Sequence, residues 1–255
     1  VFKGLETKLI YSDHHLSHSL TALAYSNSKE DICSVVVDGF GDRSTASISQ
    51  VIDPTQINEL WECLYPVSLG LFYSSITDYL GFAINEGEYK VMGLSSFGNS
   101  NSRFAKLVSG LMDWDSKSNK LISDMSYFDY HLSTSNSYSN KLVDLLGPAR
   151  NPFVPLIPGD KDFQRCADIA RGAQDLTVNL LCKIFTHAYQ LTSSRRFMFS
   201  GGVSMNSAAI DSIAQLPFVD EIIIPPSPGD AGCAIGAAFY CYIKSNFYKN
   251  LKITK

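Results

Sequence analysis

The run Asp13-His-His-Leu-Ser-His-Ser19 places three of the chain's five histidines at the start of a predicted helix. Its first residue is a good N-cap, because an aspartate side chain can accept hydrogen bonds from the first N–H groups of a helix. His14 and His18 are four residues apart, so a helix places both imidazoles on one face. Leucines at 16, 20 and 23 fall roughly on the other side, which favours a core helix.

Two histidines on the face away from the leucines can serve a metal site, because both imidazoles can converge on one ion. A plainer interpretation is a helix start whose histidines only form hydrogen bonds. On this run alone, both interpretations stay open.

The composition is typical of a globular protein. The chain has 255 residues, of which 45% are hydrophobic and 18% are charged, enough for one large or two small domains. A net charge of -4 argues against a nucleic-acid scaffold. Its six cysteines form no Cys-x-x-Cys pair, which indicates reduced core thiols and a cytoplasmic setting. We find no signal-peptide pattern or apolar run of membrane-spanning length, so no membrane partner is expected.

A predicted hairpin follows the helix. Residues 33–38 are a continuous run of mainly β-branched residues, typical of a buried strand, and residues 44–52 resume strand character after a glycine-rich turn. The turn Gly39-Phe-Gly41-Asp42, with Asp38 before it, offers backbone N–H groups and a carboxylate that suit a phosphate and its bound cation. An ordinary hairpin is the alternative.

Helical patterns dominate the middle of the chain. A short glycine-bracketed helix in residues 86–98 carries Lys90, which could reach an anion or simply be solvated. Residues 113–137 are rich in Ser, Asn and Asp and predict an irregular surface insert. His187 comes near the end of the last long helix, where the helix dipole favours a protonated imidazole. Helices are predicted over residues 69–81, 101–112, 138–146 and 162–191.

The last third of the chain alternates strands and helices. The strand 196–200 leads through Gly201 and Gly202 into a helix, and paired glycines at such a junction let a flat ligand approach the backbone. Another strand, at 221–224, leads through a proline-rich turn to Asp230, a predicted N-cap. The helix after it consists largely of small residues and must pack closely against something. With the early hairpin, this pattern predicts an α/β fold with mixed sheets.

Seven segments together resemble the NodU/CmcH-type O-carbamoyltransferase family and occur in that family's order. They are DHHLSHS, VVDGFGD, LGLFYSSITDYLGF, EYKVMGLSSFG, GPARNP, FSGGVSMN and PPSPGDAGCAIGAA. The resemblance implies an actin/Hsp70-like ATPase (ASKHA) fold, related to the proteins that complete threonylcarbamoyladenosine in tRNA. It also implies a domain that uses ATP or carbamoyl-adenylate and a metal, usually Fe(II), to transfer a carbamoyl group to a hydroxyl of a small sugar-like or antibiotic-like acceptor.

Residue roles follow from the same resemblance. His14, His18 and Asp230 would bind the metal, Asp38 would lie at the phosphates or the metal, and His15 could help to deprotonate the acceptor hydroxyl. The expected nucleotide contacts are Gly39, Gly41, Lys90, Gly201, Gly202, Val203, Asn206 and Gly229. At position 178 the family usually has a glutamate where this chain has valine, so a ribose or acceptor contact is expected to be missing.

The resemblance also sets expectations for the parts of the protein. Residues 1–58 would be the remainder of a first lobe and residues 59–255 a second lobe. The family's N-terminal strands and its C-terminal YrdC-like domain, which makes carbamoyl-adenylate, fall outside the chain. We therefore expect a piece of a longer enzyme, unable to run the full reaction alone, that self-associates, as a homodimer for example, or needs its missing lobe.

Two other functions compete with this one. The first is a truncated, non-catalytic remnant that binds a nucleotide or a partner protein. The second is a tRNA-modifying relative, against which the net negative charge counts, so that no nucleic-acid partner is expected. The retained His14, His18 and Asp230 favour the transferase.

Overall fold

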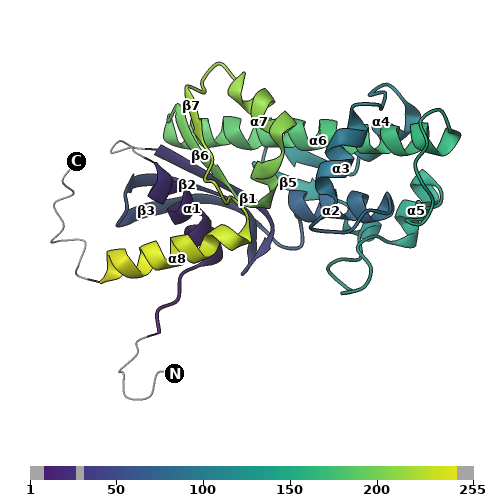
Figure 1. The fold of residues 1–255 in the computed structure, drawn as a ribbon. Coiled ribbons are helices and arrows are strands. Elements are labelled where there is room, and N and C mark those ends of the chain that lie inside the picture. The colour runs from purple at the N-terminus through teal and green to yellow at the C-terminus, as the bar shows by residue number, and fades with distance from the viewer. Residues whose placement is uncertain (1–8, 27–31, 246–255) are drawn as a thin grey trace, which may run out of the picture.

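The computed structural model describes residues 9–26 and 32–245. Its centre is a five-stranded sheet with the strand order β3-β2-β1-β6-β7 (Figure 1). Strands β1, β2 and β3 pair antiparallel, whereas β6 and β7 join parallel to β1. The predicted α/β fold with a mixed sheet is confirmed. The strands span Ile32–Gly41 (β1), Ser44–Asp53 (β2), Gln56–Leu64 (β3), Arg196–Ser200 (β6) and Glu221–Ile223 (β7).

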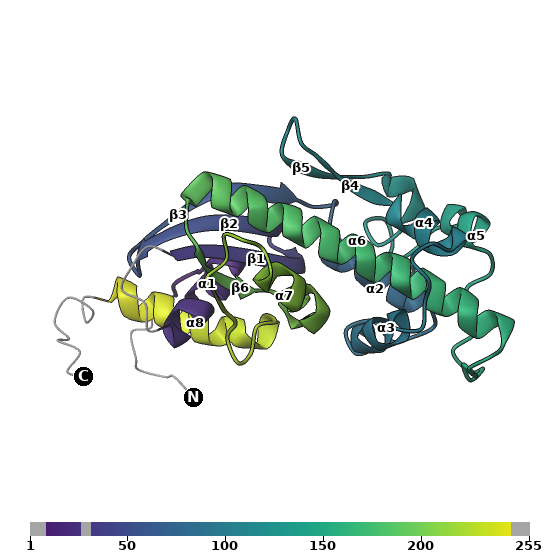
Figure 2. The same ribbon diagram turned by 90° about the horizontal axis from the view of Figure 1, so that it is seen from above.

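Helices cover both faces of the sheet. Helices α1 (His14–Tyr25) and α8 (Asp230–Lys244) lie side by side on one face, and the long α6 (Lys161–Thr192) crosses the other (Figures 1 and 2). Strand β1 contributes side chains to the interface with α1 and α8 and to the interface with α6, because alternate side chains of a strand point to opposite faces. Val35 and Val37 belong to the core that α6 shares, whereas Ile32 packs with Leu20 of α1. Both faces of β1, at the centre of the sheet, are therefore buried.

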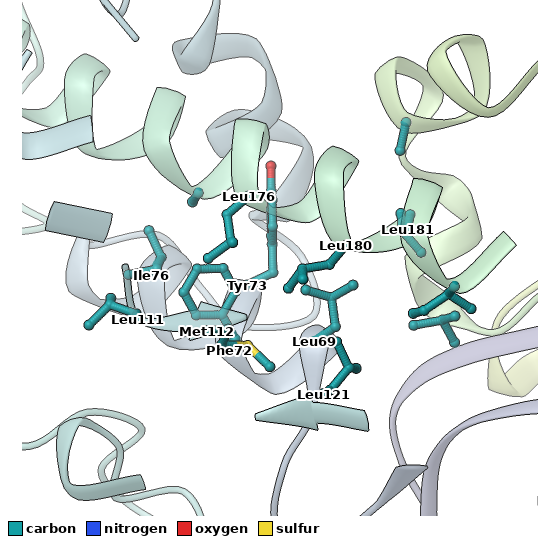
Figure 3. Close-up of a cluster of buried hydrophobic side chains, with 14 of the residues drawn as sticks. Leu69, Phe72, Tyr73, Ile76, Leu111, Met112, Leu121, Leu176, Leu180 and Leu181 are labelled. Atoms are coloured by element: carbon teal, nitrogen blue, oxygen red, sulfur yellow. The ribbon is translucent and has the colours of Figure 1, made fainter. Parts of the chain in front are cut away.

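The N-terminal half of α6 extends away from the sheet and packs among the helices of a helical region (Figure 2). In Figure 3, side chains of α2, including Phe72 and Ile76, pack against Leu176 and Leu180 of α6. The predicted boundary between residues 58 and 59 falls inside β3, and the division into two lobes stays a prediction. The other elements of this region and of the chain's end are α2 (Leu69–Tyr79), α3 (Glu88–Ser95), α4 (Arg103–Ser109), β4 (Met112–Asp115), β5 (Lys120–Ser123), the 3₁₀ turn Met125–Tyr127, α5 (Asn140–Leu146), the 3₁₀ turn Gly202–Met205 and α7 (Ser207–Ala214).

The prediction of an irregular surface insert at residues 113–137 is wrong for the part up to Ser123, which is a hairpin, whereas residues 124–137 contain turns and one short 3₁₀ turn. Strands β4 and β5 pair as a hairpin, and Trp114, Leu121 and Phe128 are buried in the larger core. The Trp61 indole N–H donates to the Asn119 carbonyl at 2.6 Å, which ties the hairpin tip to β3. The polar residues that dominate the composition form the turns, while a few apolar side chains anchor the segment. Within the described residues, no helix is both long and apolar enough to cross a membrane.

His187 packs against two tryptophans, Trp61 of β3 and Trp114 of this hairpin. Its ring centroid is 6.0 Å from that of Trp61 and 5.6 Å from that of Trp114, and its Nδ1 has no hydrogen-bond partner in the described part of the chain. Burial lowers the pKa of His187 below 6.5, because the apolar surroundings disfavour the charged imidazolium. The expected effect of the helix dipole is therefore outweighed by burial.

We expect His187 to weaken the protein at acidic pH. Because its folded-state pKa lies below its unfolded value of 6.5, the unfolded chain takes up the proton first, and stability falls as pH drops below 6.5. A His187→Phe variant should lose less stability between neutral and acidic pH than the wild type. Urea unfolding followed by the fluorescence of Trp61 and Trp114 measures this difference, and parallel pH profiles for the two proteins would contradict it.

Candidate functional site

The N-terminus of α1 is held to the end of β1. Asp13 Oδ1 accepts a hydrogen bond from the Leu16 N–H at 3.0 Å, which confirms the predicted N-cap. The His14 backbone N–H donates to Asp42 Oδ2 at 2.9 Å, across the turn that follows β1. These two bonds fix where the helix begins, and so they direct the His14 and His18 side chains toward the strand.

Four polar side chains meet at this point. The His14 and His18 Nε2 atoms are 3.1 Å apart, and they lie 3.1 Å and 3.3 Å, respectively, from Asp38 Oδ2. Asp230 Oδ1, at the start of α8, is 3.5 Å from both nitrogens. Two imidazole nitrogens bound to one ion at about 2.1 Å are about 3.0–3.4 Å apart, so the observed spacing suits shared coordination of a metal. The structure thus brings together the three predicted ligands and Asp38, which was expected at the phosphates or the metal.

Asp38 is held in place by the glycine turn after β6. Its Oδ1 accepts a hydrogen bond from the Gly202 N–H at 3.0 Å, while its Oδ2 faces the histidines. Gly201 has φ +88°, and a Cβ there would lie 2.2 Å from the Val37 carbonyl oxygen. Only glycine fits this close approach of two backbones without strain. The predicted Gly201-Gly202 pair therefore positions the carboxylate of Asp38.

The charges of the cluster perturb one another. Burial opposes ionisation of Asp38, but hydrogen bonds from His14, His18 and the Gly202 N–H outweigh it and hold the pKa of Asp38 well below its usual range. The hydrogen bond to Asp38 raises the pKa of His14 despite partial burial. Burial and the charge of Asp38 raise the pKa of Asp230. Two carboxylates this close repel each other, and a bound cation would relieve that repulsion.

Cys233 also belongs to this group, although the sequence analysis did not include it. One ligand atom from each of His14, His18, Asp230 and Cys233 lies within 4.8 Å of the others. Burial and the charges of Asp230 and Asp38 raise the pKa of the Cys233 thiol to about 12. Its position three residues after Asp230 on a predicted helix was the signal that could have identified it.

A cavity of about 700 Å³ opens beside the cluster. It lies between β1 with its following turn and the helices α2 and α3, and its lining includes apolar side chains such as Leu71, Met92 and Met205. The carboxylates of Glu86 and Glu88 line it with those of Asp38 and Asp230, and no lysine or arginine does within the described residues. The predicted site residues that line it are Asp38, Gly39, Gly202, Val203, Asn206, Gly229 and Asp230.

Asn206 is fixed by a network on the cavity wall. Its side-chain amide exchanges two hydrogen bonds with that of Gln174, at 2.9 and 3.0 Å, and Tyr73 donates to Gln174 Oε1 at 2.9 Å. The Thr177 hydroxyl, also in the lining, has no hydrogen-bond partner among the described residues. Sequence reasoning missed the lining residues Tyr73 and Thr177 and the Gln174 amide that holds Asn206, because these side chains come from two separate helices.

Six of the predicted residues do not line the cavity: His14 and His18, which form the cluster, Gly41 and Gly201, which lie against His14 and Val37, and His15 and Lys90. His15 is 3% exposed and its Nδ1 is 2.8 Å from the Ser47 hydroxyl of β2. Burial and the neighbouring His18 and His14 lower the pKa of His15 to about 4, so it is neutral near pH 7. Lys90 is exposed on α3, with its Nζ 5.8 Å and 5.7 Å from the ring centroids of Phe82 and Tyr89. Neither placement supports the roles expected of these two side chains.

Comparison with known proteins gives one family match, to the carbamoyltransferase N-terminus, over residues 3–239. The Synechocystis protein sll1178 is 33% identical over 233 residues, which are 90% of this chain and 36% of that protein. The nodulation protein NolO of Bradyrhizobium diazoefficiens is 28% identical over 227 residues, or 89% of this chain and 37% of NolO. The chain thus spans little more than a third of either relative's length.

The solved structures that match the chain share little of its sequence. Full-length HypF in its phosphate- and nucleotide-bound form has a TM-score of 0.49 and 15% identity, over 95% of this chain and 44% of that one. The Clostridium difficile activator of 2-hydroxyisocaproyl-CoA dehydratase, with bound ADPNP, has a TM-score of 0.47 and 15% identity, over 94% of this chain and 70% of that one.

Proposed function

The chain belongs to the carbamoyltransferase N-terminal family, and we propose that it carries the acceptor-side part of an O-carbamoyltransferase. The proposed reaction transfers a carbamoyl group from carbamoyl-adenylate to a hydroxyl of a small sugar-like or antibiotic-like acceptor. The observation that carries this proposal is the convergence of His14, His18, Asp38 and Asp230 at the edge of the cavity.

The proposed metal ligands are His14, His18 and Asp230. Two imidazoles and a carboxylate form the donor set that non-haem Fe(II) often takes, and Zn or Mn would also fit it. When bound, the ion would supply Lewis acidity to the carbamoyl carbonyl or charge to the adenylate phosphate. Asp38, which the Gly202 N–H orients, would keep both Nε2 atoms directed toward the ion by accepting hydrogen bonds from them before metal arrives.

The charge of the cavity supports a nucleotide whose binding depends on metal. A nucleotide phosphate is anionic, whereas the charged side chains that line the cavity are all carboxylates within the described residues. The phosphate therefore needs a cation and backbone N–H groups to balance its charge. Gly39, Gly202 and Gly229 leave the lining backbone open to a flat ligand, and Asn206 presents a fixed amide.

Metal analysis tests the proposed site. Wild-type protein purified without oxygen should hold a near-stoichiometric amount of divalent metal, and His14→Ala and Asp230→Ala should each lose it, because each variant removes a ligand. His131→Ala, which removes an imidazole outside the cluster, is the control. Adenylate affinity should also fall when a chelator strips the metal.

The outcomes of this experiment separate the candidate functions. Metal that is lost in both variants, together with carbamoyl transfer from supplied carbamoyl-adenylate to a hydroxyl acceptor, would support the transferase. Metal-dependent nucleotide binding without transfer would favour the non-catalytic remnant. A wild-type protein that takes up no metal, even with nucleotide present, would overturn the proposed site.

A further inference from the structure

Cys233 places a sulfur donor next to the cluster of His14, His18 and Asp230. It follows Asp230 by three residues in α8, so both side chains lie on the same side of the helix. All six cysteines are free thiols, but Cys233 alone belongs to a group of potential metal ligands in the described part of the chain. The short side chain of cysteine has one rotatable bond before its sulfur, so Sγ has few alternative positions.

The distances in this group are near the range that the donor atoms of one metal ion span. An imidazole nitrogen at about 2.1 Å and a thiolate at about 2.3 Å from one ion are at most about 4.4 Å apart. The four donor atoms lie within 4.8 Å of one another. In tetrahedral geometry such a pair is about 3.6 Å apart, so movements of about 1 Å, which rotation of the Asp230 and Cys233 side chains can supply, would bring every donor within bonding distance of one ion.

We propose that Cys233 is a fourth protein ligand of the metal bound by His14, His18 and Asp230. This inference rests on the metal site in the proposed function. As the sulfur–metal bond forms, the thiol S–H bond breaks and its proton passes to solvent. A thiolate among the ligands favours zinc, cobalt(II) and iron(II) over magnesium, calcium and manganese, which prefer oxygen ligands.

A packing role is the alternative for this cysteine. Helices α1 and α8 pack closely around Gly232 and Gly236, and a small side chain beside Gly232 suits such an interface. That role would be kept by serine or alanine, and it makes no prediction about the spectrum of a bound metal.

Cobalt(II) titration of metal-free protein, in a buffer that binds cobalt only weakly, distinguishes the two roles. Wild-type protein should show the visible ligand-field bands of bound cobalt and a near-ultraviolet sulfur-to-cobalt charge-transfer band. Cys233→Ser should keep the ligand-field bands, lose the charge-transfer band and bind cobalt at least about 10-fold more weakly, since even outer-shell partners contribute that much. Cys241→Ser, later in the same helix, is the matched control and should behave as wild type.

The titration can contradict the proposal in two separate ways. Ligand-field bands without a charge-transfer band in the wild type, and equal cobalt affinity in Cys233→Ser, would overturn the cysteine ligand and leave the metal site standing. Absence of ligand-field bands in the wild type would overturn the site itself, and the cysteine ligand with it. Equal thermal unfolding of the metal-free proteins would show that the substitutions do not act through folding.

Discussion

Gly41→Ala is expected to abolish tight metal binding while the protein remains folded. A Cβ at Gly41 would lie 2.1 Å from His14 Cδ2 and 2.6 Å from His14 Cγ, far inside van der Waals contact. The His14 backbone N–H is tied to Asp42, so the helix start cannot easily retreat. The ring must instead rotate away from His18 and Asp38, which removes one ligand from the cluster.

The size of the effect follows from the loss of a ligand. Disturbing an outer-shell partner weakens metal binding by about 10- to 100-fold, and removing a direct ligand should cost more than that. Calorimetric or competition titration with zinc measures the change. Gly39→Ala is the matched control in the same strand, because its Cβ would meet only Leu71, at an ordinary 3.6 Å. Equal metal affinity in Gly41→Ala and the wild type would contradict the argument.

The features that the sequence predicted well are those with local causes. The helix that starts after Asp13 was predictable because its N-cap and its four-residue histidine spacing lie within one turn. The strand at residues 33–38 and the long helix α6 were predictable from runs of apolar residues with the right period. The small-residue helix α8 was expected to pack closely, and it does so against α1.

The features that the sequence did not predict depend on contacts between distant segments. The polar composition of residues 113–137 did not indicate that Trp114 and Leu121 are buried, because their burial depends on α6 and β3 lying beside them. From the sequence, Lys90 could reach an anion, but the structure places this side chain outside the cavity.

His15 is a different case, because helix geometry alone argued against its predicted role. Successive helical residues are rotated by about 100°, so His15 cannot share the face of His14 and His18. In the structure it points at Ser47 in the sheet. Asp38, by contrast, was predicted near the phosphates or the metal, but its place among the histidines came from the meeting of α1, β1 and the Gly202 turn.

Gly236→Ala is expected to destabilise the protein strongly. A Cβ at Gly236 would lie 1.9 Å from the Ser17 carbonyl oxygen and 2.7 Å from Thr21 Oγ1, both in α1. Thr21 Oγ1 also donates at 2.8 Å to the Gly232 carbonyl, so the two helices are joined at this crossing. Overpacking a tight contact costs about 1–3 kcal/mol and occasionally more, and here the neighbour is backbone, which cannot rotate away.

Gly93→Ala is the control that separates packing from helix propensity. Its Cβ would meet nothing within 4 Å, and Gly93 lies inside α3 as Gly236 lies inside α8. Alanine is favoured over glycine in a helix by about 0.5–1 kcal/mol, so Gly93→Ala should stabilise the protein slightly. Urea unfolding of both variants measures the two changes, and a stabilising Gly236→Ala would contradict the close crossing of α1 and α8.

The same substitution tests how the metal site is held together. Helix α1 carries His14 and His18, while α8 carries Asp230 and Cys233, so the donors can converge only while the two helices keep their separation. If Gly236→Ala forces the helices apart, metal affinity should fall in the variant molecules that remain folded. Reduced stability with unchanged zinc affinity would mean that the proline-rich turn before Asp230, rather than the helix crossing, sets the position of the carboxylate.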